Sequence, residues 1–93
     1  MELEWDEAKS QACFLDRGFD FAYAAKVFFD PLRHIRADLR RSYGEARFHL
    51  YGRVESRVFV LVYTQRGNAT RIISARKANS REITLYENNT HKN

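Results

Sequence analysis

The segment that most limits how this chain can fold is Val58–Thr64, which carries apolar side chains on both of its faces. A strand with one face in water shows strict alternation of polar and apolar residues, whereas a strand inside a sheet does not. The longest nearly unbroken apolar run, Val58–Tyr63, is far too short to cross a bilayer. We therefore expect this segment to be the central strand of a sheet in a globular domain.

The residues on either side of this segment have the pattern of two further strands. Side chains two residues apart share a face of a strand, and positions 46–54 alternate in this way. Ala46, Phe48, Leu50, Gly52 and Val54 face one side, and Arg47, His49, Tyr51 and Arg53 face the other. Tight turns at 55–57 and 65–68 connect the central segment to its neighbours, the second leading to a strand near 70–76. The pattern predicts a three-stranded antiparallel meander with one basic, aromatic face.

The first part of the chain has the pattern of a short strand followed by two helices. Residues 1–5 alternate as a strand does, and Asp6 is a suitable N-cap for a helix that ends at Gly18. The apolar stripe of this helix is Ala8, Ala12 and Leu15. Asp20 begins a second helix, Asp30-Pro31 ends it, and its inward face holds Phe21, Ala24, Ala25 and Phe28. A short strand near 32–36 and a loop to Gly44 are expected next.

The C-terminal residues predict one more short helix. Asn79 and Glu82 have the spacing of a capping box, and Ile83 and Tyr86 give the helix an inward edge. The polar residues 88–93 lack periodicity and are expected to form a disordered tail. The order of elements favours a single α+β domain over residues 1–87, with a small antiparallel sheet, two N-terminal helices on one face and a short C-terminal helix.

The charge of the chain is unevenly distributed. Residues 1–30 hold seven acids and three bases (net −4), whereas residues 31–93 hold five acids and thirteen bases (net +8), eleven of them arginine. Arginine bonds phosphate oxygens in pairs through its planar fork, so we expect a polyanionic partner. Cys13 is the only cysteine, which excludes an internal disulfide and fits a reducing compartment. No signal peptide or membrane segment is visible, so a cytoplasmic location is expected.

The residues that could carry chemistry point to work on RNA without a cofactor. His34, His49 and His91 lack the spacing of metal ligands, and no glycine-rich loop joins a strand to a helix. RNA supplies its own nucleophile, the 2′-hydroxyl, so an enzyme has to align it, stabilise charge and move protons. Glu45, Arg47 and His49 precede or occupy one strand, and Arg76 and Lys77 end another. The alternative is that the arginines are a solvated surface, that Glu45 only pairs with one of them, and that Glu82 is only a helix cap.

Ordered motifs along the chain resemble those of the BrnT toxin family. They include Trp5-Asp6-Glu7 with Lys9, Asp30-Pro31, Tyr43-Gly44-Glu45 with Arg47, and Arg71-Ile72-Ile73-Ser74-Ala75-Arg76-Lys77-Ala78 followed by Arg81-Glu82 and Tyr86. The resemblance implies a RelE-like fold and metal-independent RNA cleavage that inhibits translation. It also implies a bacterial type II toxin–antitoxin pair, in which a BrnA-like ribbon-helix-helix antitoxin neutralises the toxin. The antitoxin binds operator DNA, and the toxin is associated with this DNA only indirectly, through the antitoxin.

The resemblance also implies roles for residues. Arg47 and Arg76 become phosphate contacts, Glu45 a proton acceptor, and Tyr86 the fourth catalytic candidate. The resemblance adds Lys77 and Arg81 as RNA-binding candidates to His49, Tyr51 and Arg53, which the alternation places on the basic face.

One departure leaves alternatives open. The family usually has Lys-His-Gly where this chain has Asp16-Arg17-Gly18, and arginine cannot move protons at neutral pH. Either the family histidine has a structural role, or another residue such as His49 takes over its proton transfer, or this protein is a weak nuclease. A weakly active or inactive homologue that acts as an antitoxin-binding co-repressor is the second hypothesis. A nucleic-acid chaperone that binds RNA without cutting it is the third.

Overall fold

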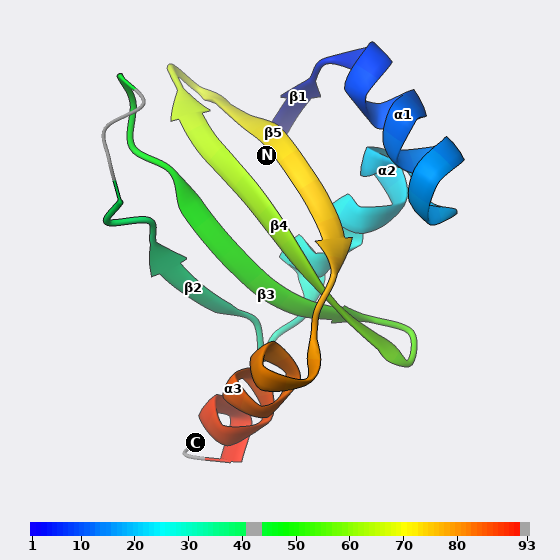
Figure 1. Cartoon of the computed structure of the whole chain (residues 1–93). Coiled ribbons are helices and arrows are strands. Elements are labelled where there is room, and N and C mark those ends of the chain that lie inside the picture. Colours follow the sequence, from blue (N-terminus) through cyan, green and yellow to red (C-terminus); the bar gives the residue numbers. More distant parts are fainter. Residues whose placement is uncertain (41–43, 92–93) are drawn as a thin grey trace.

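A computed structural model of the chain describes residues 1–40 and 44–91. Its strands form a five-stranded sheet in the order β1-β5-β4-β3-β2 (Figure 1). The strands are β1 (Glu2–Trp5), β2 (His34–Ala37), β3 (Phe48–Val54), β4 (Arg57–Arg66) and β5 (Ala69–Lys77). The helices are α1 (Glu7–Arg17), α2 (Phe21–Ala24), the 3₁₀ helix η1 (Ala25–Phe29) and α3 (Ser80–His91). None of these helices has the length and apolar composition needed to cross a membrane.

The strand β4 lies at the centre of the sheet, as its two apolar faces predict. Val60 and Leu61, which are neighbours in the chain and so face opposite sides, have exposed fractions of 1% and 0%. On one side, α1, α2 and η1 cover the sheet. Their residues Cys13, Phe21 and Val27 belong to the same buried cluster as Leu61.

The sheet is mixed, which corrects the expectation of an antiparallel sheet. The meander β3-β4-β5 is antiparallel, but β1 pairs with β5 in the parallel direction, with Glu2 opposite Ala69 and Trp5 opposite Ile72. The pattern of residues 1–5 predicts a strand but carries no information on its direction. Since β1 and β5 are far apart in the chain, no hairpin turn fixes how they pair.

The local signals for helix ends are confirmed. Asp6 accepts hydrogen bonds from the backbone N–H groups of Ala8 and Lys9, and Gly18 ends α1 in the left-handed conformation at φ 86°. Asn79 and Glu82 bond reciprocally at 2.9 Å to each other's backbone N–H groups. The second predicted helix is divided into α2 and η1, and it ends at Asp30 as expected.

The buried face of α1 differs from the predicted stripe. Ala8, Ala12 and Leu15 are exposed, Leu15 by 82%, whereas Ser10 and Cys13 face inward. The small inward residues have specific partners: Ser10 Oγ accepts the backbone N–H of Phe21 at 3.0 Å, and Cys13 Sγ lies 3.6 Å from the carbonyl oxygen of Ala75. Because these contacts hold α1 close to α2 and β5, they outweigh the apolar periodicity of the helix.

The C-terminal helix covers part of the second face of the sheet. Tyr51 from β3 packs in a second buried cluster with Val58 and Val60 of β4 and with Ala78 and Tyr86. Tyr51 is only 6% exposed, so this part of the predicted basic face is not open. In addition, α3 runs on to His91, so residues 88–91 are helical and not part of an irregular tail. The end of the expected tail, 92–93, and part of the loop expected before Gly44 lie outside the described residues.

Candidate functional site

The part of the second face that α3 leaves open carries polar residues in rows across the sheet. Strand register aligns His34, Tyr51, Val60 and Arg76 in one row and Arg36, His49, Val62 and Ser74 in the next. Residues two apart in a strand share a face, so both rows lie on the side opposite α1. This geometry places Arg36, His49 and Arg76 on one surface, which we call the open face. Tyr51 lies on the same side of the sheet but is covered by α3.

His49 is held by a carboxylate that the sequence pattern does not single out. Its Nε2 lies 3.2 Å from Oδ2 of Asp38, and the two side chains are 23% and 3% exposed. Two side-chain hydrogen bonds of 2.9 Å from Arg40, together with its backbone N–H, hold the pKa of the Asp38 carboxyl far below its usual range. A permanently ionised carboxylate therefore orients the imidazole. The available signal was that Asp38 is the only acid in the arginine-rich segment 31–44.

A shallow pocket surrounds this histidine. It has a volume of about 360 Å³, and its lining includes Arg36, Asp38, Arg40, His49 and Tyr51. Within the described residues, Arg36 forms no ion pair, so its charge is available to an anion in this pocket. The arrangement combines an imidazole with nearby guanidinium groups.

Arg76 is fixed by the first turn of α3. Its Nη1 and Nη2 donate to the two carboxylate oxygens of Glu82 at 2.7 Å each, and its side chain stays 44% exposed. The hydrogen bonds from Arg76 lower the pKa of Glu82 against the opposing effect of burial, and the charge of His49 adds to this lowering. His49, Arg76 and Glu82 therefore share one electrostatic environment on the open face.

The structure does not bring Glu45 to Arg76. Glu45 Oε1 accepts from Arg66 Nη2 at 3.1 Å, and its Oε2 lies 3.7 Å from Arg47 Nε. Arg76 is aligned with Tyr51, and Tyr51 lies four residues beyond Arg47 in the chain. Four residues of extended strand span about 13 Å, so Arg47 and its partner Glu45 are separated from Arg76 by about that distance along the sheet. Arg47 is nearer to His49, because the two share a face two residues apart and the carbonyl of Arg47 accepts the backbone N–H of Asp38 at 2.8 Å.

Tyr86 and Arg53 attach α3 to the rest of the molecule. Tyr86 is 2% exposed, and its hydroxyl donates to Oδ2 of Asp30 at 2.6 Å. The guanidinium of Arg53 lies over the Tyr86 ring, 5.4 Å from its centroid, and 3.9 Å from a carboxylate oxygen of Glu87. Tyr86 therefore lies on the inward edge of α3, as the sequence pattern predicts, and not on the open face.

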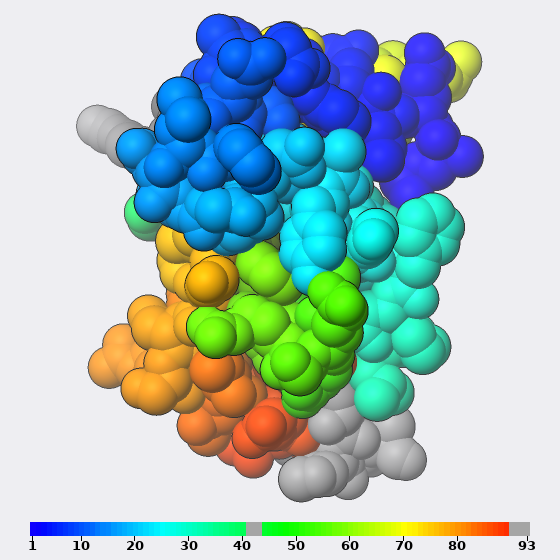
Figure 2. Space-filling model, turned by 90° about the vertical axis from the view of Figure 1, so that its right-hand side faces the viewer, coloured from blue at the N-terminus to red at the C-terminus, as the bar shows by residue number. Residues whose placement is uncertain are grey.

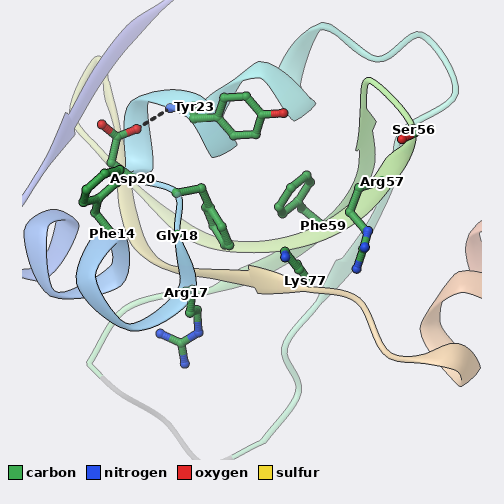
Figure 3. A pocket seen from close by; sticks show the side chains of 10 residues that line it. Phe14, Arg17, Gly18, Asp20, Tyr23, Ser56, Arg57, Phe59 and Lys77 are labelled. Carbon is green, nitrogen blue, oxygen red and sulfur yellow. Dashed lines mark hydrogen bonds between the residues drawn. The ribbon is translucent and has the colours of Figure 1, made fainter.

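The last two predicted RNA-binding residues lie apart from each other. Lys77 is opposite Phe59 in the β4–β5 register, so its side chain is on the face opposite to that of Arg76. There it lines a different pocket with Arg17 (Figure 3). Arg81 is exposed on the first turn of α3, beside Glu82.

The described residues contain no group of three or more histidine, cysteine or acidic side chains placed to hold a metal ion. A comparison with protein families then identifies the chain. A family model described as "Ribonuclease toxin, BrnT, of type II toxin-antitoxin system" matches residues 5–82. No curated protein matches the chain.

Proposed function

The chain belongs to the family of BrnT ribonuclease toxins of type II toxin–antitoxin systems, and we propose that it cleaves RNA on the open face of its sheet without a metal ion. The observation that carries this proposal is His49, held by Asp38 at 3.2 Å in the row next to that of Arg76. A proton acceptor and phosphate-binding arginines on one surface are what attack by a 2′-hydroxyl requires.

The proposed reaction needs no group beyond the RNA, the side chains and water. His49 takes the proton of the 2′-hydroxyl, whose oxygen forms a bond to the neighbouring phosphorus. The bond from phosphorus to the 5′-oxygen breaks, and a water molecule protonates that oxygen. Arg36 and Arg76 stabilise the charge on the phosphoryl oxygens, and Arg47 contacts the RNA strand beyond His49. The products are a 2′,3′-cyclic phosphate and a 5′-hydroxyl.

This assignment revises the roles that the resemblance implies. Glu45 is engaged with Arg66 and Arg47, so His49 replaces it as proton acceptor. Asp38 enters as a positioning residue, and Tyr86 receives a structural role. Arg17, which stands where the family has histidine, does not take part in proton transfer. His49 therefore supplies the proton chemistry that Arg17 cannot.

Cleavage of a single-stranded RNA oligonucleotide in excess EDTA tests the proposal. His49→Ala should lower the rate by about 10²–10⁴-fold, the usual contribution of a general base. Arg76→Lys keeps a charge beside Glu82 but loses the paired hydrogen bonds, and should lower the rate at least tenfold. Arg33→Ala, an exposed arginine outside the open face, is the matched control. Unchanged cleavage by folded His49→Ala protein would overturn the assignment.

Membership of a type II family implies an antitoxin partner. We propose a BrnA-like ribbon-helix-helix protein, a RelE-type relationship for the fold, and action in the cytoplasm. Exposed apolar side chains near the edge strand β2 favour a protein partner there: Phe29 is 79% exposed, Leu32 48%, Ile35 43% and Leu39 91%. A partner segment can pair with the free edge of β2 and cover these residues.

The same surface supports the second candidate function, an inactive homologue that binds the antitoxin as a co-repressor. Tight antitoxin binding without RNA cleavage, measured beside an active relative, would favour the co-repressor. RNA cleavage by the purified chain would exclude it.

A further inference from the structure

Some cations of this chain are paired with acids, and others are not. A carboxylate oxygen of the same chain lies within 4 Å of Arg40, Arg47, Arg53, Arg66, Arg71 and Arg76. In the described part of the chain, Arg17, Arg57 and Lys77 form no such ion pair. These three residues come from the end of α1, the start of β4 and the end of β5, and they line a single pocket.

The pocket lies on the side of the molecule where α1, α2, the β3–β4 hairpin and the end of β5 meet (Figure 2). Its volume is about 520 Å³, within the range of about 300–1,000 Å³ that is usual for small-molecule sites. Phe59 and Tyr23 form part of its wall. Figure 3 shows Lys77 and Arg57 on one side of Phe59 and Tyr23 on the other, whereas the side chain of Arg17 points away from the Phe59 ring.

The charge of the pocket favours an anion. Three cations face one acid, Asp20, and that carboxylate already accepts the backbone N–H of Tyr23 at 2.9 Å as the cap of α2. Phe14, which is 55% exposed at the edge of the pocket, gives an aromatic surface on which a base can stack. Cations beside an exposed aromatic ring are the combination that binds the phosphate and the base of an unpaired nucleotide.

We propose that this pocket binds one nucleotide of a single-stranded RNA, with its phosphate on Arg57 and Lys77 and its base on Phe14, and with Arg17 adding positive charge at the rim. The pocket is a second subsite, distinct from the open face. Arg76 and Lys77 are consecutive in β5 and face opposite sides, so an RNA strand that contacts Arg76 reaches the pocket by passing around the end of β5. The inference rests on the proposed function for the identity of the polymer.

Titration of ¹⁵N-labelled protein with adenosine 5′-monophosphate, followed by NMR, tests the subsite separately from cleavage. The amide signals of residues 17–20, Arg57 and Lys77 should shift, and those of Arg36 and His49 should shift less. Inorganic phosphate should bind more weakly because it lacks the stacking on Phe14. Adenosine should bind more weakly still because it lacks the charge-assisted hydrogen bonds to the cations. An absence of shifts at the pocket with adenosine 5′-monophosphate would overturn the proposal.

A double variant identifies the residues responsible. Arg57→Ala with Lys77→Ala should raise the Kd for adenosine 5′-monophosphate at least tenfold, because charge-assisted hydrogen bonds are lost. Lys9→Ala with Arg33→Ala removes the same charge outside the pocket and should change the Kd less than twofold. Equal effects of the two double variants would show non-specific attraction and overturn the subsite. Preferential binding of a hexaglutamate peptide at these residues would overturn it in favour of a protein partner.

Different experimental results would contradict the subsite and the proposed function. Nucleotide binding at the pocket without RNA cleavage would contradict the function and support the subsite. Cleavage without nucleotide binding at the pocket would contradict the subsite alone.

Discussion

Arg76 donates two hydrogen bonds of 2.7 Å to Glu82, which simultaneously accepts the backbone N–H of Asn79. One carboxylate therefore fixes an arginine of the open face and caps α3. The same helix covers Tyr51 on β3 and presents Tyr86 to Asp30. The position of Arg76 and the attachment of the C-terminal helix are consequently coupled.

This coupling predicts a pH-dependent contribution of Glu82 to stability. The pKa of Glu82 is lowered in the folded protein from its usual value of 4.5, mainly by hydrogen bonds from Arg76. Its stabilising effect is therefore fully present above pH 4.5 and is lost as pH falls through the lower folded pKa. Glu82→Gln should lower the free energy of unfolding by about 1 kcal/mol at pH 7. The effect is small because solvent screens the partly exposed ion pair of Glu82 with Arg76.

Urea unfolding of both proteins at pH 7 and at pH 3 measures this effect. The difference between wild type and Glu82→Gln should shrink at the lower pH. A difference that is the same at both pH values would show that the charge of Glu82 is not what stabilises the cap.

The structural role of Tyr86 predicts that its hydroxyl affects stability and not catalysis. Tyr86→Phe removes the 2.6 Å hydrogen bond from the Tyr86 hydroxyl to Asp30. The Asp30 carboxylate still accepts the backbone N–H of Arg53 at 2.7 Å in the variant. The variant should be destabilised by about 1.5–3 kcal/mol, the usual value for a hydrogen bond to a charged group. RNA cleavage below the unfolding transition should remain within about twofold of wild type. A loss of more than tenfold in the folded variant would return Tyr86 to the catalytic residues.

The sequence pattern predicts features that depend on neighbouring residues. The N-cap at Asp6, the capping box at Asn79 and Glu82, and the central strand β4 all follow from local spacing, and the structure confirms them. The direction of β1 and the inward side of α1 depend on partners far away in the chain. Cys13, for example, contacts the carbonyl of Ala75, 62 residues further on. Periodicity within α1 carries no information on such a contact.

The same contrast between local patterns and contacts with distant residues applies to the candidate site. Alternation in β3 places Arg47, His49 and Tyr51 on one side of the strand, and the register agrees. Alternation does not show that α3 returns over Tyr51, nor that Asp38 meets His49 from the neighbouring strand segment. Adjacency in the sequence predicts Arg76 and Lys77 in one site, but consecutive residues in a strand face opposite sides, and the register places them on opposite faces of the sheet.

The contact between Asp38 and His49 predicts that the carboxylate positions the imidazole for cleavage. Asp38→Asn removes the carboxylate whose Oδ2 lies 3.2 Å from His49 Nε2, so kcat should fall about tenfold while KM stays within about twofold. Glu2→Gln, which neutralises an exposed acid of β1, serves as control and should leave kcat unchanged. A kcat equal to that of wild type in folded Asp38→Asn protein would show that Asp38 does not position His49.

The close packing of η1 on β3 predicts that Gly52 cannot carry a side chain. A Cβ at this position would lie 2.8 Å from Val27 Cβ and 3.1 Å from the carbonyl oxygen of Val27. Gly52→Ala should therefore destabilise the protein by about 1–3 kcal/mol, the usual cost of overpacking. Urea unfolding measures this change, and stability equal to wild type would show that η1 shifts without cost.

Analysis of the ends produced from RNA in excess EDTA tests the central claim most directly. The purified chain is incubated with a single-stranded RNA and with its 2′-O-methyl counterpart, and the products are examined by mass spectrometry. The proposed reaction predicts fragments ending in 2′,3′-cyclic phosphate and 5′-hydroxyl from the RNA, and no fragments from the methylated strand. Cleavage of the methylated strand, or cleavage of RNA only when a divalent metal is added, would contradict attack by the 2′-hydroxyl on the open face.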